Sequence, residues 1–288
     1  MKKHTLLVIA TTVVLPLSSI AREATTHEAH GPVHDAVIAE QKAILLKNTE
    51  GKGFGPQSPR DIDLKAGSNP RVFQHAPAYT QMNLCNIHFH NNAEHKGGEF
   101  IKYAGNGDSH GNLSGYQYSG TLSPTESKPV AHEVCSSDHG GLAVGDTIEL
   151  HYVYSTAQVQ PGVTLGACMN DTIKNPQLRV EAQVFVLVND KRAMDFIKLT
   201  QVGEKNGFKQ ALNIPTDTGE PIQYTGSTTG PAYNTQGSPF QVTWGVRPKV
   251  SKVHIDSIGE WCKDNVFKED HAHGVRNLIT NPALLSPM

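Results

Sequence analysis

Two short segments with alternating polar and apolar residues constrain the fold of this chain most strongly. Residues 86–90 have the sequence NIHFH, and residues 149–151 have the sequence ELH. Because a β-strand turns successive side chains to opposite faces, His88 and His90 share one face, and His151 points away from Leu150. If the two strands are neighbours in one sheet, the three imidazoles converge on one point with apolar residues behind them.

Three neutral imidazoles with an open fourth position form a ligand set of catalytic zinc sites. We therefore predict that His88, His90 and His151 hold one Zn²⁺ ion, a site that could also accept Co²⁺ or Cd²⁺. Asn86 and Glu149 each lie two residues from a histidine, on the same face of the same strand. There each can accept the second ring N–H and fix the tautomer of the ligand.

The first 21 residues have the pattern of a secretory signal peptide. Lys2 and Lys3 precede an apolar stretch over residues 6–20, and small residues precede a cleavage point after Ala21. An uncleaved membrane anchor is the alternative. No later stretch is long and apolar enough to span a bilayer, so we expect an exported protein, periplasmic or secreted, without a membrane partner.

Charge and composition exclude several partners. Cleavage removes two of the 25 basic residues and none of the 27 acidic ones, which leaves a mildly acidic chain. This balance does not favour nucleic acid or an anionic membrane, so we expect a small-molecule substrate. The oligomeric state stays open.

The chain contains four cysteines, all after the predicted cleavage point. An even number of cysteines in an exported protein predicts two disulfides, with three possible pairings. We predict the pairs Cys85–Cys135 and Cys168–Cys262. Metal binding by the cysteines is the alternative, but no Cys-x-x-Cys pair occurs.

Two segments have helical patterns, over residues 35–48 and from Ile255 to about Val266, where Asp256 or Ser257 is the expected cap. The polar residues 22–34 before them are expected to form a flexible leader, and loose metal binding by their histidines is the alternative. A second His-x-His pair, at residues 271–273, is expected in a solvated turn.

The rest of the chain consists of short apolar runs separated by Gly, Pro, Asn and Asp. These runs predict strands over 83–90, 99–104, 115–121, 146–155, 179–189, 195–200, 221–225 and 240–247. No repeat or linker divides them. We therefore expect one mainly β (α+β) domain over residues 35–288, with a large, twisted, mostly antiparallel sheet and a few short helices.

With these segments in order, the chain resembles the delta-class carbonic anhydrases and, more distantly, the α-type enzymes. The motifs that carry the resemblance are QSP at 57–59, HFH at 88–90, EH at 94–95, ELH at 149–151, GSTT at 226–229 and VTW at 242–244. The resemblance implies an α-carbonic-anhydrase-like fold. It also implies zinc-dependent, reversible hydration of carbon dioxide to bicarbonate and a proton, through a zinc-bound hydroxide.

The resemblance also assigns roles to further residues. Thr229 would orient the hydroxide, and Glu94 would accept the hydrogen of the Thr229 hydroxyl. Val153, Val242 and Trp244 would form an apolar substrate pocket, although simple core packing explains them equally well. A histidine must carry the proton to buffer. His75 is preferred over the other candidates, which are His95, His110, His132 and His139.

Two departures from the α-type pattern bear on these roles. The interval between His90 and Glu94 is shorter than in the α-type enzymes, which favours the delta class. Gly230 follows Thr229 where the family has a second threonine, so Thr228 is the alternative working residue.

Two other functions compete with this one. A cupin would use Glu94 as a fourth metal ligand, but the cupin pattern requires a glycine where Met82 stands. A non-catalytic metal-binding module with the same fold would be expected to lose a ligand histidine, and all three are present.

Overall fold

The computed structural model describes residues 31–288. The predicted signal peptide and the predicted leader up to residue 30 lie outside this part. Val33, near the end of the predicted leader, donates its backbone N–H to Gly107 O. Within residues 31–288 the helices are α1 (Asp35–Thr49), α2 (Phe196–Leu199) and α3 (Ile255–Lys263), with 3₁₀ turns at Tyr79–Gln81, Leu165–Cys168, Pro231–Asn234 and Pro282–Leu284.

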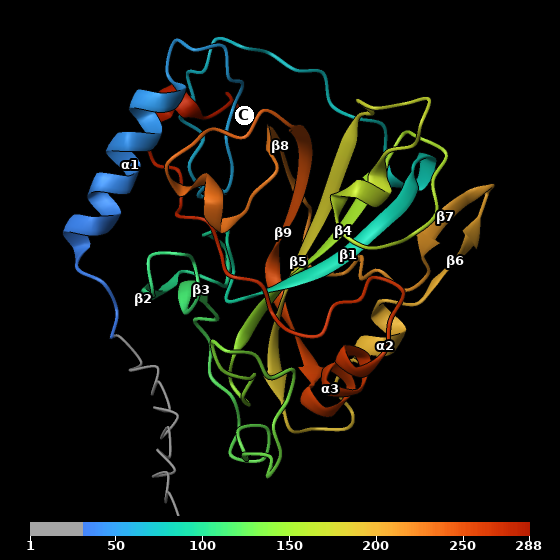
Figure 1. Ribbon diagram of the computed structural model, residues 1–288. Coiled ribbons are helices and arrows are strands. Elements are labelled where there is room, and N and C mark those ends of the chain that lie inside the picture. The colour runs from blue at the N-terminus through green and yellow to red at the C-terminus, as the bar shows by residue number, and fades with distance from the viewer. Residues whose placement is uncertain (1–30) are drawn as a thin grey trace, which may run out of the picture. The chain divides into compact units, whose positions relative to one another are not determined.

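A five-stranded sheet forms the centre of the described residues (Figure 1). Its strands, in spatial order, are β1 (Asn83–Asn91), β4 (Thr147–Ser155), β5 (Leu178–Val188), β9 (Gln241–His254) and β8 (Ile222–Ser227). Only the β5–β9 pair is parallel, and the other neighbours run antiparallel. The predicted mainly β fold with a mostly antiparallel sheet is therefore confirmed.

Both faces of the central sheet are buried along β4 and β5, which explains why residues 184–188 of β5 are apolar without interruption. On one face, Phe89 packs against Phe196 of α2 and Trp261 of α3, so the two short helices cover this side. On the other face, Val153 and Trp244 belong to a second apolar cluster. His88, His90 and His151 lie on this second face.

Two small hairpins complete the described strands. The first pairs β2 (Lys102–Asn106) with β3 (Ser114–Gln117), and the second pairs β6 (Val202–Lys205) with β7 (Phe208–Ala211). The second hairpin was not predicted from the sequence. Its turn is Asn206–Gly207, both with positive φ, and an Asn-Gly pair between strands is a strong signal for such a turn.

The predicted strand over 195–200 is wrong, because α2 occupies this segment. The Asp195 side chain accepts the Lys198 N–H and so caps the helix, while Phe196 and Leu199 bury the same face one turn apart. The predicted cap of α3 is also wrong. The cap position is His254, and Ser257 lies inside the first turn, where its hydroxyl donates to His254 O.

All four cysteines form disulfides, as predicted, but the predicted pairing is wrong. The bonds are Cys85–Cys168 and Cys135–Cys262. The connection between β4 and β5 folds back onto β1 and brings Cys168 to Cys85, and Cys135 lies against α3, next to Ile258 O. None of the helices in residues 31–288 has the length and apolar character needed to cross a membrane.

Candidate metal centre

The antiparallel register of β1 and β4 brings the three predicted ligands together. His88 lies opposite His151, and His90 lies opposite Glu149. One ring nitrogen from each of the three histidines lies within 4.8 Å of the others. The condition on which the prediction depended, neighbouring strands with the histidines on one face, is therefore met.

Each imidazole uses one ring nitrogen in a hydrogen bond that turns the other nitrogen inward. His88 Nδ1 lies 2.7 Å from Asn86 Oδ1, and His151 Nε2 lies 2.8 Å from Glu149 Oε1. His90 Nδ1 lies 2.8 Å from Gly274 O, a partner that the sequence analysis did not predict. Because these acceptors fix the tautomers, the free nitrogens are Nε2 of His88, Nε2 of His90 and Nδ1 of His151.

These three nitrogens fit a divalent cation. His90 Nε2 is buried without a hydrogen-bond partner among the described residues, and His151 Nδ1 lies 3.3 Å from His88 Nε2. Burial lowers the pKa of His90 to about 4, and burial with the neighbouring rings lowers the pKa of His88 well below its usual value. Both rings are therefore neutral at neutral pH, which gives a ligand set with lone pairs directed at one point.

Glu149 also binds a fourth histidine. Its Oε1 lies 2.7 Å from His95 Nδ1, and its Oε2 accepts the His95 backbone N–H. Burial alone would raise the pKa of Glu149, but the His95 and His151 rings that donate to it hold this pKa well below its usual value. His95 Nε2 in turn lies 2.7 Å from the Tyr224 hydroxyl. His95 is fully buried, so its place is behind the ligands and not in a path to solvent.

The predicted pair of Thr229 and Glu94 is formed in the structure. The Thr229 hydroxyl donates to Glu94 Oε2 at 2.7 Å, and the Arg276 backbone N–H donates to Glu94 Oε1 at 3.0 Å. Glu94 Oε1 lies 3.8 Å from His90 Nδ1, so the pair adjoins the histidine cluster. Thr228, the alternative, instead pairs its hydroxyl with Ser238 Oγ.

The QSP motif holds both ends of the loop that carries Thr229. Ser58 Oγ accepts the Ser227 N–H, and the Gln57 side chain binds both the N–H and the carbonyl of Ser238. A Cβ at Gly226 would collide with Ser58 Oγ, so glycine is required at this close approach. The motif therefore positions the loop from a distant part of the sequence.

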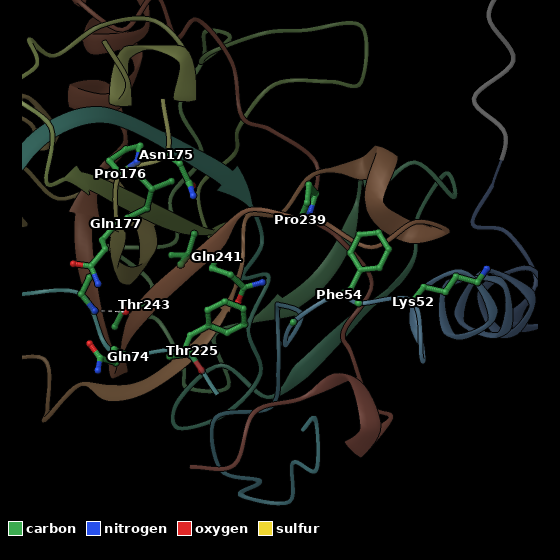
Figure 2. Close-up of a pocket in the computed structure, with 16 residues that line it drawn as sticks. Lys52, Phe54, Gln74, Asn175, Pro176, Gln177, Thr225, Pro239, Gln241 and Thr243 are labelled. Carbon is green, nitrogen blue, oxygen red and sulfur yellow. Dashed lines mark hydrogen bonds between the residues drawn. The ribbon is translucent and has the colours of Figure 1, made fainter. Parts of the chain in front are cut away.

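The three predicted pocket residues are buried in one apolar cluster. The Trp244 ring lies 5.1 Å from the His151 ring, centroid to centroid. Val242 also lines a cavity of about 430 Å³ at the start of β9 (Figure 2). Gln74, Gln177 and Gln241 also line this cavity, so it presents amide groups beside apolar side chains.

The preferred proton carrier, His75, is not brought to the cluster. Its side chain is exposed, and the neighbouring Ala76 N–H donates to Thr243 Oγ1. Strand alternation turns Thr243 to the face opposite Trp244 and the three histidines. His110, His132 and His139 are exposed, and the latter two lie near carboxylates of Asp256 and Asp108.

The second His-x-His pair requires a correction. The segment around His273 does not form a free turn but a bridge beside His90: the His273 N–H donates to Phe89 O, and the Asn91 N–H donates to His273 O. The His273 ring lies 5.6 Å from the His88 ring and binds Glu269 Oε2. Burial works against its charged form, but this bond raises the pKa of His273 above its usual value.

The chain is similar to known carbonic anhydrases. The family model described as delta carbonic anhydrase matches residues 79–257. No curated protein matches the sequence. Similar solved structures include a hyperthermostable carbonic anhydrase from an active hydrothermal vent chimney (15% identity over 80% of this chain and 87% of that chain, TM-score 0.28). The α-carbonic anhydrase of Thermovibrio ammonificans, solved with the inhibitor sulfanilamide, has 17% identity over 77% of this chain and 84% of that chain, with a TM-score of 0.27. The α-carbonic anhydrase of Photobacterium profundum has 14% identity over 79% of this chain and 88% of that chain, with a TM-score of 0.27.

The fold and the site define a β-sheet protein with a three-histidine cluster suited to one metal ion. The chain belongs to the delta carbonic anhydrase family, because that family model covers more than half of its sequence. With TM-scores this low, the assignment rests on the family model and not on the solved structures.

Proposed function

We propose that this protein catalyses the zinc-dependent, reversible hydration of carbon dioxide to bicarbonate and a proton. One observation carries the proposal: three free imidazole nitrogens face one another beside the hydrogen-bonded pair of Thr229 and Glu94. A metal site alone could store or transport an ion. A threonine hydroxyl that is hydrogen-bonded to a buried carboxylate beside the metal site could in addition orient a small oxygen nucleophile.

His88, His90 and His151 would hold the zinc ion, and Asn86, Glu149 and Gly274 O would fix their rings. Zinc with three neutral ligands lowers the pKa of a bound water to about 7 and so supplies a strong nucleophile at neutral pH. Thiolate or carboxylate ligands would neutralise the metal. The neutral imidazoles of this site keep its full charge available.

Thr229 would set the direction of attack. Because its hydroxyl gives its hydrogen to Glu94, the Thr229 oxygen can only accept a hydrogen from the nucleophile. Glu94 is held by donors on both carboxylate oxygens, one from Thr229 and one from Arg276. The nucleophile would then turn a lone pair, and not its hydrogen, toward the substrate carbon.

Carbon dioxide is small and uncharged, so an apolar site suits it. Val153, Val242 and Trp244 would provide that site, and the Trp244 ring already lies against His151. Three heavy atoms allow little binding free energy, at most about 1.5 kcal/mol per atom. The rate must therefore come from the nucleophile and its orientation.

The cupin alternative loses support in this geometry. A cupin would need a free Glu94 oxygen directed at the metal point, yet both oxygens accept hydrogen bonds from other groups. No observation in the described residues favours a second function over carbon dioxide hydration.

We also propose that the protein is exported, to the periplasm or beyond, after cleavage behind Ala21. Two disulfides support an oxidising compartment. In this layout residues 22–34 are a leader and residues 35–288 form one domain. N-terminal sequencing of the protein from its native host tests this, and an N-terminus at Met1 would contradict it.

Stopped-flow measurement of carbon dioxide hydration tests the proposed activity, with His151→Ala as the matched control. The purified zinc-loaded protein should accelerate hydration, and the variant should not. If the zinc-loaded protein and the variant both show only the uncatalysed rate of hydration, the protein is a metal-binding module and the proposed activity is contradicted.

A further inference from the structure

The strand that supplies two of the three proposed ligands contains a β-bulge at Cys85. Leu84 lies opposite Tyr154, and Asn86 lies opposite Val153, so Cys85 has no partner of its own on β4. A bulge shifts the alternation of side chains. As a result Leu84 packs on the helix-covered face, while Asn86, His88 and His90 all turn to the opposite face.

The connection between β4 and β5, residues 156–177, is joined to this bulge by a hydrogen bond and a disulfide. The Gly162 N–H donates to Cys85 O at 3.0 Å, and Cys168 forms the disulfide with Cys85. The end of β4 holds Cys168 in turn, because the Ser155 hydroxyl donates to Cys168 O at 2.7 Å. The start of β1 is thus tied to the far end of the strand that carries His151.

The same connection also contacts Asn86, which is hydrogen-bonded to His88 of the proposed metal site. The Asn86 amide NH₂ donates to Gly162 O at 3.1 Å, and its oxygen lies 2.7 Å from His88 Nδ1. If the amide were reversed, its NH₂ would face the His88 N–H, donor against donor, and the Gly162 carbonyl would face an oxygen. The connection therefore fixes which end of Asn86 faces His88, and with it the ring nitrogen that faces the metal.

We propose that the Cys85–Cys168 disulfide is a positioning device for the metal centre. It keeps the β4–β5 connection on β1, so that the bulge and the Asn86 amide hold His88 Nε2 toward the other two ligand nitrogens. Loss of this bond loosens the metal site before it unfolds the domain. The inference rests on the proposed function, because it assumes that the three histidines bind the metal.

The second disulfide provides a matched control. Cys135–Cys262 joins the loop after β3 to α3, on the helix-covered side of the sheet. The cysteines are separated by 83 residues in the first bond and by 127 in the second. Because loop-closure entropy depends only on the logarithm of loop length, the two bonds restrict the unfolded chain to a nearly equal extent. A difference in metal affinity between the two deletions therefore reports on position in the fold.

The experiment compares two double variants, Cys85→Ala/Cys168→Ala and Cys135→Ala/Cys262→Ala. Zinc affinity is measured by competition with a chromogenic chelator, the ligand geometry by the visible spectrum of the Co²⁺ form, and stability by the Tm of the metal-free protein. Both variants should have a lower Tm. Only the first should bind zinc more weakly, by ~10- to 100-fold, as expected when support of a ligand is lost, and change the cobalt spectrum.

Equal zinc affinity and equal cobalt spectra in the two variants would overturn the proposal. If the first variant does not fold, the Cys135→Ala/Cys262→Ala protein replaces it, because Cys85–Cys168 is then its one disulfide, and its zinc affinity is measured before and after reduction with a phosphine. A reduced protein that stays folded and keeps its zinc affinity unchanged would then overturn the proposal. Failure of the proposed function looks different, since the unmodified protein would then bind no zinc at the three histidines or would bind it without accelerating carbon dioxide hydration.

Discussion

The histidine cluster and the Thr229 loop are positioned at the same site by different kinds of contact. The histidines project from two adjacent strands, and the β1–β4 ladder places His88 opposite His151. Thr229 lies on a loop whose position depends on side chains far away in the sequence, such as Gln57, 181 residues before Ser238. In the proposed function the ladder would therefore govern metal binding, and the long-range contacts would govern what the bound metal can do. Substitutions in the histidine cluster should therefore change zinc affinity, and substitutions in the Thr229 loop should change turnover.

Loss of a ligand should have the largest effect. In His151→Ala, one of the three inward nitrogens is removed, and the Glu149 carboxylate loses one of its donors. We expect zinc occupancy and hydration activity to fall together to background, measured by metal analysis and stopped-flow assay on the same sample. A variant that retains full activity without stoichiometric zinc would contradict the claim that the histidines on β1 and β4 hold the catalytic metal.

Thr229→Ala should come next and should affect turnover alone. The variant keeps all three histidines but loses the hydroxyl that we propose directs the nucleophile. We expect normal zinc content and a kcat lower by ~10²-fold, comparable to removal of one group that stabilises a transition state. Thr228→Ala is the control, because its hydroxyl binds Ser238 and not Glu94. The reverse result, a larger loss of kcat in Thr228→Ala, would assign the role to Thr228.

Removal of the groups behind the ligands should have a smaller effect, on affinity. Glu149→Gln replaces an acceptor of three N–H groups with an amide whose NH₂ must oppose either the His95 backbone N–H or the ring N–H groups of His95 and His151. Asn86→Ala removes the acceptor of His88 Nδ1. Each variant should bind zinc ~10- to 100-fold more weakly with its fold intact, as judged by chelator competition and circular dichroism. Unchanged affinity in both would remove these residues from the account.

His75→Ala should have the smallest effect. The ring is exposed, and its segment is bonded to the face of the sheet opposite the histidines. In dilute buffer we expect a change in kcat far below the ~10²-fold that a positioned acid or base contributes. A large loss of kcat that added imidazole restores would instead make His75 the proton carrier and would require another conformation of residues 71–78.

The difference between the two regions also explains what could be predicted from the sequence. Strand alternation is a local property, so the shared face of Asn86, His88 and His90 could be predicted, and the neighbouring β4 followed from one further segment. Gly274 O and His273 could not be predicted in this way. They lie on a segment some 180 residues further along, which forms a backbone bridge beside His90 and presents Gly274 O to the His90 ring.

The disulfides show the same limit. An even cysteine count predicts that bonds form, but the partner of Cys85 depends on where residues 156–177 fold back. The predicted strand at 195–200 failed for a different reason. Its apolar residues suit either structure, and one side-chain bond from Asp195 to the Lys198 N–H favours the helix. Thr229 could be assigned only through the resemblance of its motif, because nothing local distinguishes it from Thr228.

The most direct test of the account is a crystal structure of the zinc-loaded protein with anomalous scattering measured at the zinc edge. We predict one zinc peak at ~2.0–2.1 Å from His88 Nε2, His90 Nε2 and His151 Nδ1, with Glu94 bonded to Thr229 and not to the metal. A zinc ion bound by Glu94, or a His151 ring turned so that Nε2 faces the metal, would contradict it.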